Sequence, residues 1–109
     1  MDLIKCFNDT MGLATEGKLR HKTRKAQKSV RVYKEGFTAK KHKKFYSKAD
    51  IIVERNTSFA SASKYLKYGR TAVLNFANPV HPGGGVEVGA MAQEECLCRS
   101  SNGFIQGVH

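Results

Sequence analysis

Two adjacent glutamates, Glu94 and Glu95, are the side chains of this sequence best suited to acid–base chemistry. They follow Gln93 in a stretch of small and apolar residues, which we expect to form a buried helix. Neighbouring carboxylates in a buried cleft repel each other and lose water, and both effects favour the protonated form of one of them. A carboxylic acid that keeps its proton near neutral pH can act as a general acid.

A structural explanation of the pair stays open at this point. Acidic residues in the first turn of a helix complement its dipole. Glu95 could also pair with Arg99 four residues later, an exposed interaction of about 0.3–0.5 kcal/mol.

Three consecutive glycines, Gly83, Gly84 and Gly85, precede the expected helix. Without Cβ atoms, this backbone can come close to a ligand, and the helix that follows offers its N-terminus to an anion. A phosphate or diphosphate would suit such a loop. The sequence lacks the Gly-Lys-Ser/Thr ending of a P-loop, and Val88 fills the third glycine position of GxGxxG. An ordinary flexible turn is the alternative.

The periodicity of apolar residues predicts three helices that would hold this site. The first covers residues 2–15, and the second runs from Phe59 to Leu66 and ends near Gly69. The third begins at Gly89 or Ala90 and ends at Arg99.

Short β-branched and apolar runs predict strands at residues 51–53 and 71–76, with a further short strand from Val30 to Gly36. Residues 51–76 would then form a parallel βαβ unit with a right-handed crossover. The fold class is therefore expected to be α/β. Ligands in such folds bind at the carboxyl ends of the strands, where the glycine loop follows residue 76.

Residues 17–48 carry most of the positive charge of the chain. They contain thirteen Lys/Arg and one acid, Glu35, which is +12 of a total net charge of +10. One interpretation is a polyanion partner, and nucleic acid could bind only through this segment. The other is a solvated surface. Four aromatic residues interleave with the charges: Tyr33, Phe37, Phe45 and Tyr46.

Other features exclude several classes of protein. No apolar run is long enough to span a bilayer, and the N-terminus lacks the apolar core of a signal peptide. Three cysteines without a framework spacing (Cys6, Cys96 and Cys98) indicate reduced thiols in a cytoplasmic protein. The four histidines are scattered, so we expect no metal site.

The glycine loop and the glutamates together resemble the signature of poly(ADP-ribose) glycohydrolases: Gly83-Gly84-Gly85, seven residues, then Gln93-Glu94-Glu95. The flanking residues 73–78 and 97–101 resemble the bacterial and microbial-type branch of that family. The resemblance implies a macrodomain, a three-layer α/β/α sandwich that binds ADP-ribose without a cofactor or metal.

The resemblance also implies roles for single residues. Glu95 would be the catalytic acid, and Glu94 would help to hold the ribose hydroxyls. The loop would wrap the diphosphate and the ribose that is cleaved, so a valine at position 84 should block the ligand and leave the fold largely intact. The substrate-binding residues would be Asn78, Gly83, Gly84, Gly85, Val86 and Gln93.

The expected function is hydrolysis of the ribose–ribose bond in poly(ADP-ribose), on the free polymer or on ADP-ribosylated proteins. A binding module without turnover is one alternative, and a basic nucleic-acid-binding protein is another. Members of the family are well over twice as long as these 109 residues. We therefore expect residues 1–109 to form an incomplete macrodomain with turnover near background. It would self-associate, exchange strands between copies or remain a loosely packed monomer.

Overall fold

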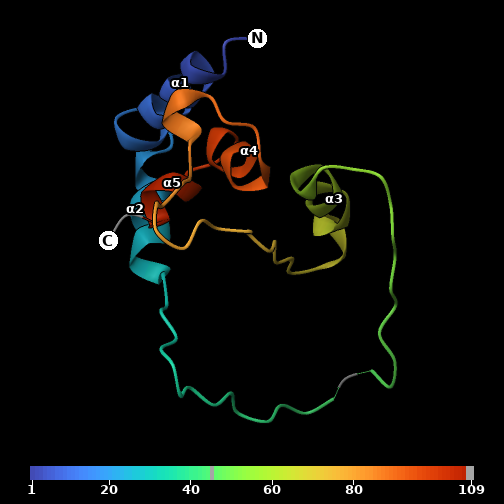
Figure 1. Ribbon diagram of the computed structural model, residues 1–109. Coiled ribbons are helices and arrows are strands. Elements are labelled where there is room, and N and C mark those ends of the chain that lie inside the picture. The colour runs from blue at the N-terminus through green and yellow to red at the C-terminus, as the bar shows by residue number, and fades with distance from the viewer. Residues whose placement is uncertain (45, 108–109) are drawn as a thin grey trace.

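The computed structural model describes residues 1–44 and 46–107, and all of its regular elements in this part are helices (Figure 1). Phe45, one of the interleaved aromatic residues, lies outside the described part. No described helix is long and apolar enough to cross a membrane. The α-helices are α1 (Leu3–Thr15), α2 (Arg20–Ser29), α3 (Ser58–Tyr65), α4 (Gln93–Arg99) and α5 (Gly103–Gly107). Two short 3-10 helices are η1 (Leu66–Tyr68) and η2 (Val86–Val88).

Helix α1 confirms the helix predicted at residues 2–15. Asp2 caps it, since its side chain accepts a hydrogen bond from the Lys5 backbone N–H at 3.0 Å. Phe7 and Ala14 are buried on the inner face. This face packs against α4 and η2, so α1 supports both the 3-10 helix that follows the glycines and the helix that carries the glutamates.

Helix α2 occupies a segment too basic for the sequence to place. It packs against α1 and α5. Its one buried residue, Thr23, is polar. The Asn102 side chain donates to the Thr23 hydroxyl at 3.4 Å. Helix α2 therefore lacks the apolar stripe by which helices are usually recognised.

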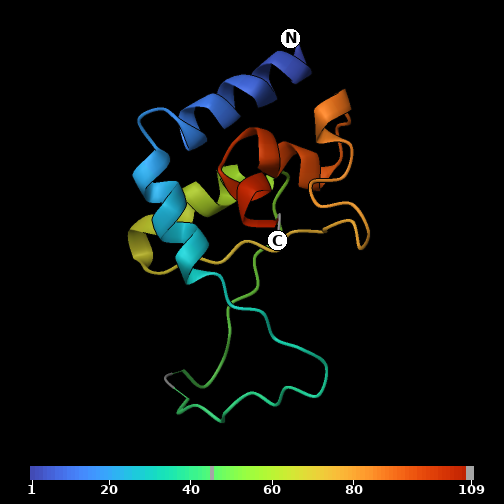
Figure 2. The ribbon, with the colours of Figure 1, turned by 90° about the vertical axis from the view of Figure 1, so that its left-hand side faces the viewer.

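The core is small and lies beneath the glycine loop. It consists of Phe7, Val86 and Cys98, with Met11 and Phe104 packed against them. The rings of Phe7 and Phe104 meet edge to face at 5.1 Å and thereby join α1 to α5. Figure 2 shows α5 close to α4, while the chain between α2 and α3 arcs away from the helices.

The predicted βαβ unit is not formed in the part of the chain that the structure describes. Helix α3 and its end near Gly69 agree with the sequence, because Thr57 caps α3 and Gly69 terminates η1 at φ 149°. Residues 30–36, 51–53 and 71–76 are irregular. A β-branched apolar run becomes a strand only when another strand pairs with its backbone.

The two apolar runs that were predicted to form the strands of the βαβ unit are instead largely exposed. Ile51 and Val53 keep 88% and 94% of their surface, and Leu74 and Phe76 each keep 71%. Exposed apolar segments that pair with no other strand favour association with another chain. Self-association stays a prediction that this surface supports.

Candidate active site

The segment from Asn78 to the glycines is a series of tight turns. The Asn78 side-chain oxygen accepts hydrogen bonds from the backbone N–H groups of Val80 and His81, both at 2.9 Å. The Gly84 N–H then donates to the His81 carbonyl at 2.9 Å. Asn78 therefore shapes the entry to the loop with its side chain.

Glu94 holds the two ends of this turn. One carboxylate oxygen accepts from the Asn78 backbone N–H at 2.8 Å, and the other accepts from the Gly83 N–H at 3.2 Å. The residue is 5% exposed. Backbone donors satisfy both oxygens, so Glu94 fixes the loop to the start of α4.

Glu95 differs from its neighbour in one respect. Its Oε1 accepts from the Gly85 N–H at 3.1 Å, whereas its Oε2 is buried and has no hydrogen-bond partner among the residues described. Glu95 is 8% exposed, so little water reaches it. A buried polar atom without a partner is costly, and a catalytic role is one of the reasons for which natural proteins retain such an atom.

The glycines are required by contacts inside the protein. Gly83 and Gly84 have φ of 79° and 56°. A Cβ on Gly84 would lie 2.5 Å from Oε1 of Glu95 and 3.1 Å from Oε1 of Glu94. A Cβ on Gly83 would lie 2.5 Å from the Phe104 ring. These contacts argue against the prediction that valine at position 84 leaves the fold largely intact, because the loop packs directly on the two carboxylates.

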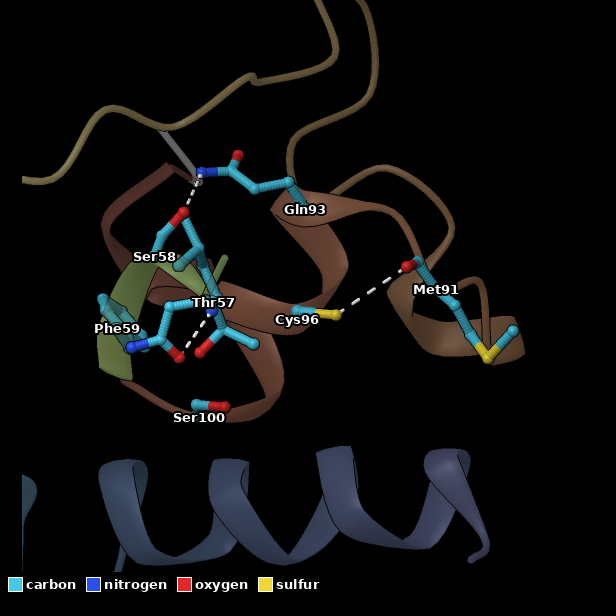
Figure 3. Close-up of a pocket in the computed structure, with 9 residues that line it drawn as sticks. Thr57, Ser58, Phe59, Met91, Gln93, Cys96 and Ser100 are labelled. Atoms are coloured by element: carbon cyan, nitrogen blue, oxygen red, sulfur yellow. Dashed lines mark hydrogen bonds between the residues drawn. The ribbon is translucent and has the colours of Figure 1, made fainter. Parts of the chain in front are cut away.

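The side-chain amide of Gln93 makes hydrogen bonds to the backbone of residues 71–76. Its side-chain oxygen accepts from the Phe76 N–H at 2.8 Å, and its nitrogen donates to the Leu74 carbonyl at 2.7 Å. These are the two bonds that a paired strand would supply. The same nitrogen donates to the Ser58 hydroxyl at 3.2 Å (Figure 3). In this conformation the amide of Gln93 ties three segments together.

This arrangement predicts a local effect of Gln93→Ala. The Phe76 amide should exchange with solvent about fivefold faster, since losing one hydrogen bond costs about 1 kcal/mol. Amide hydrogen exchange measures it. Gln93→Glu is the matched control, because it keeps the acceptor for Phe76 and loses only the donor to Leu74 and Ser58. Equal exchange of Phe76 in the alanine and glutamate variants would contradict the assignment.

Val86 and Arg99 have positions that the sequence did not predict. The Val86 side chain is fully buried in the core, so a contact with substrate would have to use its backbone. Arg99 is 7% exposed, and the surface pair with Glu95 is not formed. Its guanidinium donates to the Ala90 carbonyl at 2.5 Å and to Cys96 Sγ at 3.4 Å. Arg99 thus fixes the backbone at Ala90, after the glycine loop, to α4. A single cation in an otherwise apolar helix was the sequence signal for a buried arginine.

The thiol of Cys98 is buried close to the two glutamates, and this environment shifts its pKa. Burial raises the pKa of its thiol from 9.0 to about 11, and the nearby carboxylates of Glu94 and Glu95 add to the rise. The thiol therefore stays neutral in the folded protein at pH values where it ionises in the unfolded chain. Its contribution to stability is fully present below pH 9 and is lost as the pH rises through about 11.

The expected loss at high pH is about 2–3 kcal/mol in the free energy of unfolding. Urea denaturation at pH 8, 9.5 and 11 would measure it, with Cys98→Ala as the comparison. Other groups titrate in this range, but the difference between the two proteins isolates Cys98. Identical pH dependence in both would show that the thiol does not contribute.

A cavity of about 330 Å³ lies on another face of α4, between this helix and the start of α3 (Figure 3). Gln93 borders it, but neither glutamate does. In the described residues, no group of three or more His, Cys, Asp or Glu is placed to hold a metal ion. The lining residues are Asn56, Thr57, Ser58, Phe59, Met91, Gln93, Cys96, Leu97 and Ser100.

One comparison with known proteins agrees with the motif. No curated protein and no solved structure matches the chain. The family described as microbial-type PARG, catalytic domain, matches residues 2–106, nearly the whole sequence. The glycine loop, Gln93 and both glutamates lie within the match. The chain belongs to the microbial-type poly(ADP-ribose) glycohydrolase catalytic-domain family.

Proposed function

We propose that this protein hydrolyses the ribose–ribose O-glycosidic bond of poly(ADP-ribose), with Glu95 as general acid and then general base. Family membership supports the substrate class and the hydrolytic reaction. The assignment of the acid rests on Oε2 of Glu95, which is buried and has no hydrogen-bond partner among the residues that the structure describes. Glu94 is the weaker candidate, because two backbone N–H groups already use both of its oxygens.

The reaction follows from these positions. Protonated Glu95 gives its proton to the bridging oxygen as the bond from this oxygen to the ribose carbon breaks. The oxygen leaves as a hydroxyl of one product, and the ribose becomes an oxocarbenium ion. Glu95, now a carboxylate, takes a proton from water as the water oxygen bonds to that carbon. One acid therefore acts twice, unlike the usual two carboxylates on opposite sides of the bond.

The loop would bind the substrate through its backbone. The N–H groups of Gly83 and Gly85 donate to Glu94 and Glu95 in this structure, so a ligand would take these donors over from the carboxylates. Asn78 shapes the turn before them. A diphosphate held there places its negative charge near the developing oxocarbenium ion. Glu94 and Gln93 keep the loop and its neighbouring segments on α4.

A second candidate is ADP-ribose binding without turnover. It is favoured by the fact that the loop packs on the carboxylates and that Glu95 does not border the cavity between α3 and α4. Incubation with labelled polymer, followed by separation of free ADP-ribose, tests hydrolysis. A parallel titration with ADP-ribose tests binding. Binding with no release of ADP-ribose would favour the second candidate, and the absence of both would reject both.

A further inference from the structure

The basic segment, residues 17–48, presents its charges to solvent. Helix α2 faces inward with Thr23, and all thirteen Lys/Arg side chains of the segment are exposed. Beyond α2, the described residues up to 57 form no regular element, and this chain arcs away from the helices (Figure 1). The segment can therefore adapt its path to an extended partner.

No ion pair between described residues neutralises these cations. The ion pairs among the described residues join Lys5 to Asp9 and Lys64 to Glu54, and both lie outside the basic segment. Like charges held close together repel each other and destabilise the free protein. A polyanion relieves this repulsion, so the segment is complementary to a partner with many phosphates.

Exposed aromatic rings stand among the cations. Tyr33 and Phe37 keep 61% and 58% of their surface, and their rings lie 4.5 Å apart. Tyr46 keeps 85%. Aromatic rings alternating with positive charge are typical of surfaces that hold single-stranded nucleotide polymers, where bases stack and phosphates pair. ADP-ribose polymer carries both adenine rings and diphosphates.

The segment is also connected to the candidate active site. Its chain continues to Ser58, the first residue of α3, whose hydroxyl accepts a hydrogen bond from Gln93. Gln93 directly precedes the two glutamates. Residues 49–57 therefore join the basic segment to a helix that contacts the residue directly before the two glutamates.

We propose that the basic segment is a polymer-binding arm. It holds ADP-ribose polymer through diphosphates and adenine rings and gives the enzyme a preference for long polymer over a single ADP-ribose unit. This inference rests on the proposed function for the identity of the polymer.

The test replaces four exposed lysines of the arm (Lys40, Lys41, Lys43 and Lys44) together by glutamine. The matched control replaces the same four by arginine, which keeps the charge. The glutamine variant should show a KM for long polymer raised about tenfold, with kcat unchanged. The affinity for monomeric ADP-ribose should be equal in both variants. The slope of log affinity for polymer against log salt should fall by about 3 in the glutamine variant, by analogy with nucleic acids.

The outcomes separate the arm from the proposed function. If wild-type protein binds labelled polymer in a lysine-dependent way but releases no ADP-ribose, the arm stands and the proposed hydrolysis fails. If polymer is hydrolysed with the same KM in the glutamine and arginine variants, hydrolysis stands and the arm is overturned. Tighter binding of a single-stranded RNA with the same number of phosphates would overturn the assignment of the partner.

Discussion

Glu95→Gln should lower the rate of polymer hydrolysis by about 10²–10⁴, the usual contribution of a general acid. Glutamine has the shape of glutamate, and its oxygen can still accept from the Gly85 N–H. The amide nitrogen of the glutamine would then stand where Oε2 of Glu95 stands, and an amide gives up no proton at neutral pH. The loss should therefore appear in kcat, while the affinity for ADP-ribose changes little.

Single-turnover reactions with enzyme in excess would measure this effect, because they resolve slow rates. Glu87→Gln is the matched control, since Glu87 is an exposed acid on η2 and should behave as wild type. Glu94→Gln should weaken the loop and reduce ADP-ribose affinity, because an amide keeps only one of the two acceptors. A Glu95→Gln rate within threefold of wild type would refute the mechanism.

Gly84→Val should remove ADP-ribose binding and also destabilise the protein. The left-handed backbone costs a side-chain-bearing residue about 1–2 kcal/mol. The clash with the Glu95 carboxylate adds about 1–3 kcal/mol, in the range of overpacked sites. The loop must move away from both glutamates, so the N–H groups that would hold a diphosphate lose their arrangement.

Gly36→Val isolates the backbone part of this penalty. Gly36 also has a positive φ, 84°, but a Cβ there would meet nothing within 4 Å. Urea denaturation of the two variants should therefore differ by the clash alone, and only Gly84→Val should lose ADP-ribose in a calorimetric titration. Equal stability and retained binding in both would show that the loop is free to accommodate side chains.

Periodicity predicted the helices that bury an apolar face, and it failed where other forces hold the chain. Helix α1 was found because Phe7 and Ala14 recur on its inner face. Helix α2 was missed because Thr23, a polar residue, makes its contact. Helix α4 begins at Gln93, later than expected, since Gly89 at φ 85° and the extended Ala92 keep the preceding residues out of the helix.

The strands were the main error of fold prediction. The run at 71–76 has strand-like composition, but its backbone pairs with one side chain, Gln93, and sequence patterns cannot reveal a side chain acting as a strand. The roles of the site residues stay predictions, and the structure shows only that the loop and the glutamates are in contact. The motif brought the loop and glutamates together, yet only the structure distinguishes the satisfied oxygens of Glu94 from the free one of Glu95.

The hydrogen bonds of the loop have a consequence for the affinity of any anion. The N–H groups of Gly83 and Gly85 already bind carboxylates of the protein itself. A diphosphate that uses these donors competes with an internal anion, so its apparent affinity is lower than its affinity for an open loop. The carboxylates of Glu94 and Glu95 thus compete with the substrate for the same N–H donors. A substrate must break these hydrogen bonds before Glu95 can react with it.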